Sequence, residues 1–415
     1  MHILKIGLLL GWRQIQRASL WTTSLIICVM MLTFLNLIAV SGILVGLITG
    51  SERAFQEQFI GDLQITPLPE EDRIKATPEI VGVLNTSPLV KAFAVRYQAA
   101  GTVEANFRER RDTRADRDMV GTRVVGIDPL KEDVTTGLSA LVVEGEYLNP
   151  EEEGYILIGS LFVERFTEDF PDITDSLSDV KPGDQVRVTI NGASRDFTVK
   201  GIVDAKVGDI TSRVYITDRE LRRLSGRLDQ NADRISVRTA SEADALRIQE
   251  NLISLGYDTN AKIQTFAEAL PRFVRDIKQT FNVLGTFIGA VGIVVASITI
   301  FIIIFINALS RRRQIGILKG IGIDRRAIEV AYVFQAGIYV LIGSLLGVLI
   351  IYGFLIGYFA NNPIDFPFSD GILVAEPADT FVRFIILFVV TLAAGFVPAW
   401  MIVKQNTLNA ILGRK

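Results

Sequence analysis

The sequence has few of the residues that carry catalysis or bind metals. Its only histidine is His2 and its only cysteine is Cys28. A histidine-based triad, an HExxH zinc motif and a CxxC pair are therefore excluded. No glycine is followed by lysine, so the Walker A loop that holds nucleotide phosphates is missing as well. We expect a chain that is not an enzyme and has no metal or cofactor of its own.

Charge is missing from four long runs. Hydrophobic residues make up 49% of the chain and the mean hydropathy is +0.35, which is too apolar for an ordinary soluble protein. Each run has the roughly 20 residues that a helix needs to cross a bilayer. The runs cover residues 18–51, 281–310, 330–362 and 384–403. Their few polar residues, such as Asn307 and Gln335, include no acidic side chain, which argues against a proton- or ion-driven transporter.

The first run is expected to remain as a membrane anchor. Its apolar core is much longer than the 7–15 residues of a signal peptide. Cys28, which lies inside this run, is the only cysteine and therefore can form no internal disulfide. A soluble domain on the far side of the membrane would therefore fold without a disulfide framework, and the stretch after Glu52 is long enough to bury a core by itself.

The basic residues are distributed asymmetrically around these runs. The 43 basic and 46 acidic residues leave no basic excess, and no nucleic-acid partner is expected. Lys and Arg cluster before the first run, between the second and third, and after the fourth, whereas the loop between the third and fourth is acidic. The positive-inside rule then places both termini in the cytoplasm and the large domain outside. We expect a multi-pass protein of the cell (inner, cytoplasmic) membrane.

The predicted fold class is an α-helical membrane protein with four transmembrane helices and a large extracytoplasmic α+β domain between helices 1 and 2. The domain is expected over residues 52–270, with an α/β part at about 60–130 plus 231–265 and a β-rich insert at about 131–230. The remaining segments are a cytoplasmic amphipathic segment (1–17), transmembrane helix 1 (18–51), a stalk with transmembrane helix 2 (271–309), a cytoplasmic loop (310–326), transmembrane helix 3 (327–360), an extracytoplasmic loop (361–382), transmembrane helix 4 (383–403) and a cytoplasmic tail (404–415).

Strand and helix signals alternate within the extracytoplasmic domain. Asn191-Gly192 separates two apolar runs and is the strongest short signal for a hairpin. Ser241 is placed as the N-cap of a helix that ends at Gly256, and another helix is expected over 218–224. The charged segment 104–118 is interpreted as a solvated hairpin tip or a loop that docks a partner. The predicted strands cover 63–66, 91–103, 120–127, 155–158, 185–190, 196–203, 213–216 and 234–239.

Two helical stalks are expected to lead from this domain into the membrane. One carries apolar residues at helical spacing from Phe266 into the second run, with Pro271 near its start, where a missing N–H costs little. The other continues the first run through Phe55 and Phe59. Glycine pairs at helical spacing, Gly285/Gly289, Gly343/Gly347 and Gly353/Gly357, allow close helix packing. That packing could lie within one protomer or at a homodimer seam.

The segment between the second and third runs is short, basic and rich in glycine. A charged connection between two membrane helices can act as a lever, because both helices must respond when it is pushed. The three arginines have an alternative role as positive-inside anchors. The segment consists of Arg311, Arg312, Arg313, Gln314, Ile315, Gly316, Ile317, Leu318, Lys319 and Gly320.

Residues 313–322 resemble the coupling loop of the MacB/FtsX-like permease subunits of ABC transporters, which include the LolC/LolE lipoprotein-releasing type. Gln314 stands where members of that family usually carry glutamate. Further similarity lies in 125–129, 144–148, 182–184 and 199–203, whose order is that of the family's MacB-like periplasmic core domain, and in the closing segment 398–412. The resemblance covers nearly the whole chain.

The resemblance implies a permease subunit that couples ATP hydrolysis by a separate ABC ATPase chain to motion of extracytoplasmic domains. ATP and Mg would bind the partner ATPase, and Ile315, Ile317 and Leu318 would contact it. A homodimer or a dimer with a homologous permease is implied. The expected role is lipoprotein release or peptide or small-molecule efflux, with Phe55 and Phe59 as contacts for an acyl chain beside membrane lipid. The alternatives are an FtsX-like signalling permease that regulates an extracytoplasmic cell-wall hydrolase, and a membrane adaptor outside the ABC class.

Overall fold

The computed structural model describes residues 2–108, 117–167, 176–178, 180–366 and 369–404. The chain divides into two compact units, which are described separately below. One is helical and comprises Met1–Thr49, Asp276–Phe366 and Asp370–Lys415. The other, an α/β unit, comprises Gly50–Arg275 with Pro367–Ser369.

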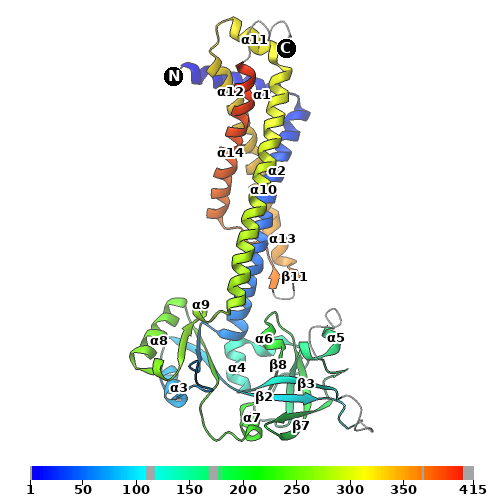
Figure 1. Cartoon of the computed structure of the whole chain (residues 1–415), viewed down its shortest axis with the longest axis vertical. Helices are drawn as coiled ribbons and strands as arrows, with labels where there is room; N and C mark the ends of the chain where they lie inside the picture. The colour runs from blue at the N-terminus through cyan, green and yellow to red at the C-terminus, as the bar shows by residue number, and fades with distance from the viewer. Residues whose placement is uncertain (1, 109–116, 168–175, 179, 367–368, 405–415) are drawn as a thin grey trace. The chain divides into compact units, whose positions relative to one another are not determined.

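In the described part of the chain, four helices are long and apolar enough to cross a membrane, as the predicted fold class requires. They are α2 (Leu20–Phe55), α10 (Arg272–Ser310), α12 (Arg325–Ile350) and α14 (Pro377–Val403). A π-helical turn at Ile351–Leu355 extends α12 into α13 (Ile356–Asn361). The connection to α14 contains two short strands, β11 (Ile364–Phe366) and β12 (Ser369–Gly371). Figure 1 labels the helices of this unit and β11.

Glycine lets the helices of the helical unit approach closely. A Cβ atom added at Gly343 of α12 would lie 2.5 Å from Cβ of Met30 in α2, and one at Gly347 would lie 2.6 Å from the ring of Phe34. Met30 and Phe34 are fully buried. The predicted Gly343/Gly347 pair therefore packs within one chain. At Gly353 and Gly357, by contrast, an added Cβ would meet nothing within 4 Å.

The N-terminal segment forms a helix of its own, α1 (His2–Gln16), which is separated from α2 by a break at residues 17–19. It runs across the end of the helical unit in Figure 1. Gly7 and Gly11 pack against the backbone of α12, where added Cβ atoms would lie 2.8 Å from the carbonyl oxygens of Ala327 and Ala331. Leu4, Leu9 and Trp12 remain exposed, as a helix at a membrane surface requires.

Ten strands of the described chain form one sheet in the α/β unit. Their order is β10-β1-β9-β2-β3-β8-β5-β7-β4, and β6 pairs with β2 and β7. The long strand β2 lies beside β9, β3 and β6, so a single sheet runs through both parts of the predicted division. The strands are β1 (Leu63–Thr66), β2 (Val90–Glu104), β3 (Met119–Ile127), β4 (Val142–Gly145), β5 (Tyr155–Gly159), β6 (Gln185–Ile190), β7 (Ala193–Val203), β8 (Arg213–Thr217), β9 (Arg234–Thr239) and β10 (Lys262–Thr265).

The predicted strands are present, and the predicted turn and helix cap are confirmed. Asn191 and Gly192 have φ values of 50° and 83°, the left-handed conformation that a tight turn between β6 and β7 requires. Ser241 accepts a hydrogen bond from the amide of Asp244, which confirms it as the N-cap of its helix. Sequence reasoning missed β4 and β10. Most of the 104–118 segment, residues 109–116, lies outside the described residues.

The helices of the α/β unit connect the strands along the chain, and several pack against the sheet. Sequence reasoning found α7 (Asp218–Ser225) and α8 (Glu242–Ser254) but missed α3 (Thr77–Thr86) and α4 (Pro129–Thr136). Asp128 caps α4 by accepting from the amides of Leu130 and Lys131. Shorter pieces are the π-helical Gln56–Ile60, α5 (Glu164–Thr167), α6 (Gly208–Thr211) and α9 (Phe266–Ala269), the last with a capping box formed by Thr265 and Glu268.

Candidate functional site

The basic segment after α10 is a short helix rather than a loop. Helix α10 ends at Ser310, and α11 (Arg312–Gly320) begins after Arg311, whose φ of −101° and ψ of 13° interrupt the helical path. Gly322 then adopts a φ of 91°, a conformation that favours glycine. Asp324 caps α12 by accepting from the amide of Arg326. The helix is therefore bounded on both sides by sharp changes of chain direction.

One face of α11 is fixed to the helical unit. Ile315 is only 3% exposed and belongs to the apolar core of this unit, and Leu318 packs against the same core. The ammonium group of Lys319 donates to the carbonyl oxygen of Val403, at a distance of 3.1 Å. Because Val403 is the last residue of α14, the lysine satisfies a terminal carbonyl and lies at the negative end of the helix dipole.

The opposite face of α11 is open to a partner. Ile317 is 49% exposed and Ile321, one turn later, is 71% exposed. Arg313, Gln314 and Gly320 are also exposed, whereas Arg311 and Arg312 are half-buried. Of the three apolar contacts predicted from the sequence, only Ile317 faces outward. Ile321 was not among the predicted apolar contacts, although it is the more exposed of the two isoleucines.

Phe55 and Phe59, the predicted contacts for an acyl chain, lie in the α/β unit and are buried. They are 4% and 5% exposed. The ring of Phe55 packs edge-on against Phe59 and Phe273, with centroid distances of 6.4 and 6.0 Å. They share an apolar core with Leu270 and Val274. Neither ring offers open surface to a ligand in this structure.

Three arginines surround the ring of Phe59. The guanidinium carbons of Arg96, Arg213 and Arg234 lie 5.4, 4.9 and 4.6 Å from its centroid. Arg96 and Arg234 are directly opposite each other on β2 and β9. Burial, together with the nearby charges of Arg213 and Arg96, lowers the pKa of Arg234 to about 9. Cation–π attraction to the ring offsets part of the repulsion within this cluster.

The buried carboxylate of Glu132 compensates part of this charge. Glu132 accepts from Nε and one terminal nitrogen of Arg96 at 2.9 and 2.5 Å, and from the hydroxyl of Thr136 at 2.7 Å. Arg96 also donates to the carbonyl oxygen of Phe59 at 2.9 Å. The Arg96–Glu132 pair, 4% and 2% exposed at its side chains, therefore holds the main chain at Phe59 in place as well as its ring.

Protein-family models match both units of the chain. The model of the MacB-like periplasmic core domain matches residues 30–255, and the model of the FtsX-like permease C-terminal region matches residues 286–407. The chain belongs to the MacB/FtsX-like family of ABC transporter permeases. Permeases of this family work with an ABC ATPase partner. The four apolar helices and the α/β unit are the membrane and core-domain parts of this permease.

Curated relatives of the permease carry export functions in their names. The macrolide export ATP-binding/permease protein MacB of Campylobacter jejuni (strain 81-176) is 23% identical over 226 residues, which are 52% of this chain and 34% of that protein. The probable export ATP-binding/permease protein MacB of Pseudomonas entomophila is 24% identical over 187 residues, 44% of this chain and 27% of that protein. The chain thus spans about a third or less of the length of these relatives.

Two solved structures are similar to the permease. The periplasmic region of MacB from Actinobacillus actinomycetemcomitans aligns with a TM-score of 0.35 and 16% identity, and covers 54% of this chain and 94% of that one. The extracellular domain of the noncanonic ABC-type transporter YknZ from Gram-positive bacteria aligns with a TM-score of 0.33 and 16% identity, and covers 49% of this chain and 98% of that one.

Proposed function

We propose that this chain is the permease part of an ABC exporter in the cytoplasmic membrane. In this proposal α11 and both termini face the cytoplasm, and an ABC ATPase that binds ATP and Mg docks on the exposed face of α11. The observation that supports this docking site is that α11 has one exposed face and one buried face. Arg313, Ile317 and Ile321 are free to contact a partner, while Ile315 and Lys319 tie the helix to the rest of the unit.

The proposed mechanism is mechanical. A docked ATPase that closes on ATP displaces α11, and the contacts of Ile315 and Lys319 pass that displacement to the neighbouring helices. Helix α10 is continuous for 39 residues, from Arg272 to Ser310, so it bends little and carries the motion along its length. No charge transfer within the membrane is required. Because Phe59 is packed and hydrogen-bonded within the α/β unit, that unit would move as one rigid body.

For the cargo, we propose a small molecule or peptide that is expelled from the outer side of the membrane. The names of the MacB relatives support an export role. The burial of Phe55 and Phe59 removes the argument from the sequence for an acyl-chain contact, so lipoprotein release and regulation of a cell-wall hydrolase are the competing outcomes. The working assembly in this proposal is a dimer of the chain with itself or with a homologous permease.

The ATPase contact is tested by purification of the tagged full chain from its native membranes in mild detergent. Mass spectrometry should identify a co-purifying ABC ATPase. Ile317→Asp should lower its recovery about tenfold or more, as for a central apolar contact in an interface. Leu228→Asp, at a 95% exposed site in the α/β unit, is the matched control and should leave recovery unchanged. Equal recovery from both variants would refute docking on α11.

The cargo class is tested in cells that lack the chain. We expect greater susceptibility to a panel of macrolides and antimicrobial peptides, with resistance restored by the wild-type chain but not by Ile317→Asp. Lipoproteins extracted from the same membranes should keep their normal distribution. If lipoproteins are retained in the membrane and susceptibility is unchanged, the cargo is a lipoprotein and efflux is refuted. If only septation is altered, control of a cell-wall hydrolase is favoured.

A further inference from the structure

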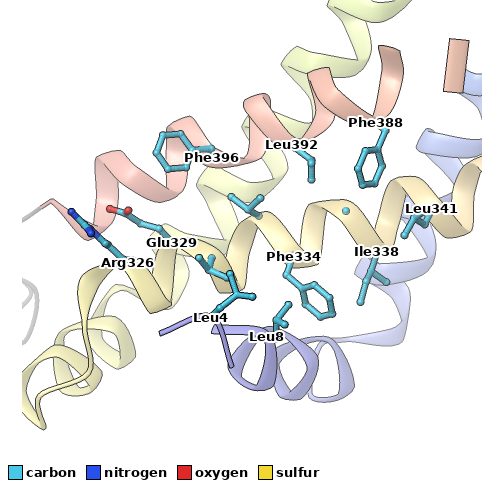
Figure 2. Close-up of a pocket in the computed structure, with 13 residues that line it drawn as sticks. Leu4, Leu8, Arg326, Glu329, Phe334, Ile338, Leu341, Phe388, Leu392 and Phe396 are labelled. Atoms are coloured by element: carbon cyan, nitrogen blue, oxygen red, sulfur yellow. The ribbon is translucent and has the colours of Figure 1, made fainter. Parts of the chain in front are cut away.

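An open apolar groove of about 720 Å³ lies on the helical unit, along α12. Figure 2 shows α12 beneath the groove, with Leu4 and Leu8 of α1 on one side and Phe388, Leu392 and Phe396 of α14 on the other. Gly337 lies in the floor, and a Cβ there would come within 3.3 Å of Leu392. The lack of a side chain at this position therefore deepens the groove. This volume falls within the roughly 300–1,000 Å³ of small-molecule sites.

The groove is charged at one end only. Arg326 and Glu329 line that end, next to Phe396 in Figure 2. Nε of Arg325 donates to Oε1 of Glu329 at 2.9 Å, so the carboxylate is already neutralised. Among the described residues, the exposed guanidinium of Arg326 has no ion-pair partner. The end of the groove therefore carries one uncompensated positive charge.

We propose that this groove binds one anionic phospholipid, with an acyl chain along α12 and the phosphate at Arg326. The floor and one wall belong to helices that cross the membrane, so a ligand enters from the bilayer and not from water. A ligand with an apolar tail and one anionic head matches the charge distribution of the groove. Arginine binds phosphate through parallel N–H donors, and basic sites between membrane helices are a known mode of anionic lipid recognition.

A second copy of the chain fits the charge of the groove less well. A symmetric dimer through this face would be isologous, with the same residues on both sides of a two-fold axis. Both copies cross the bilayer in the same sense, so their Arg326 side chains would lie at the same depth with no carboxylate left to pair them. A phospholipid instead supplies the missing negative charge. It also contacts α1 and α14 together, since Leu8 and Leu392 flank the same groove.

Native mass spectrometry of the detergent-purified full chain tests this proposal. Dioleoylphosphatidylglycerol and dioleoylphosphatidylcholine are added in equal amounts, and the population with one bound lipid is measured. We expect the wild type to prefer phosphatidylglycerol, whose headgroup carries a net negative charge, about fivefold over the zwitterionic phosphatidylcholine, the factor that corresponds to about 1 kcal/mol for one basic residue beside anionic lipid. Arg326→Gln should abolish this preference. Arg313→Gln, which removes an exposed charge from α11 outside the groove, should keep it.

A second pair of variants tests the groove itself. Val333→Phe fills the floor and should lower retention of both lipids, whereas Leu349→Phe, at a position 60% exposed on α12 outside the groove, should not. Size-exclusion chromatography checks that both variants are folded. Equal retention of the two lipids by the wild type, or an unchanged preference in Arg326→Gln, would refute the site. If the wild type is a dimer and Val333→Phe is a monomer, the groove binds a second copy of the chain and not a lipid. This proposal needs only membrane insertion, so it can fail or hold independently of ATPase docking.

Discussion

Lys319 of α11 donates a hydrogen bond to the main-chain carbonyl oxygen of Val403, over 3.1 Å. Val403 ends α14, so the bond joins the helix between the second and third spans to the end of the fourth. Together with the burial of Ile315, it determines which face of α11 stays open. The proposed docking of an ATPase on Ile317 and Ile321 depends on that orientation.

Loss of this bond should loosen α11 without unfolding the protein. A hydrogen bond from a charged donor contributes about 1.5–3 kcal/mol, so Lys319→Met should raise amide hydrogen exchange of the peptide over residues 312–320 about tenfold or more. The exchange is measured by mass spectrometry on the full chain in detergent. Lys319→Arg keeps a cationic donor and should retain most of the protection. Unchanged exchange in Lys319→Met would show that other contacts hold the helix.

The two faces of α11 should respond differently to the same substitution. Ile315→Asp places a charge in an apolar core and should reduce the yield and thermal stability of the folded protein, at a cost of several kcal/mol. Ile317→Asp at the exposed face should leave the thermal transition within a degree or two of the wild type. Scanning fluorimetry of the purified proteins makes the comparison. Similar losses of stability in both variants would contradict the division into two faces.

The proposed topology can be read from cysteine labelling. Cys28 is the only cysteine, so Cys28→Ser supplies a background without thiols. In that background, Leu228→Cys should react with an impermeant maleimide in intact cells. Ile317→Cys should react only after the membrane is opened, because the basic residues around α11 predict a cytoplasmic position. Labelling of both sites in intact cells would exclude a cytoplasmic α11.

Close packing of α2 and α12 makes Gly343 sensitive to a single methyl group. Gly343→Ala would bring Cβ to 2.5 Å from Cβ of Met30, and such overpacking costs about 1–3 kcal/mol. Gly353→Ala on the same span meets nothing within 4 Å and should be neutral or slightly stabilising, since alanine favours helix over glycine by about 1 kcal/mol. Thermal unfolding in detergent should therefore fall for the first variant only. Equal effects at both sites would point to helix propensity in place of packing.

The buried carboxylate of Glu132 should be far more important than an exposed one. Glu132→Gln leaves Arg96 beside Arg213 and Arg234 without its countercharge, and breaking a buried pair costs about 3–5 kcal/mol. Glu153, which pairs with Arg223 at 3.0 Å on the surface, is the matched control, and Glu153→Gln should leave the thermal transition unchanged. The unfolding of the α/β unit is followed by amide hydrogen exchange of its peptides in the full chain. A small effect of Glu132→Gln would mean that the ion pair of Arg213 with Asp209 and the cation–π contacts to Phe59 stabilise the cluster sufficiently.

Local signals predicted much of the architecture. Charge-free runs predicted the four spans, because a buried charge in hydrocarbon is costly whatever the tertiary fold. Asn191-Gly192 predicted its hairpin and Ser241 its helix, since a turn and a cap are decided within a few residues. Helix α4 was missed although Asp128 and Pro129 mark its start, because it lacks a clear apolar periodicity over its eight residues.

The candidate site was predictable only as a segment. The sequence by itself determined that residues 311–320 are basic, short and between two spans, because these are properties of order and composition. The tertiary structure decided that Ile315 and Leu318 are anchors, that Ile317 and Ile321 face outward, and that Phe55 and Phe59 lie in a core. Exposure depends on what packs against a side chain, and those neighbours, such as Val403 for α11 and Arg234 for Phe59, are distant in the chain. A pattern within the ten residues 311–320 cannot identify them.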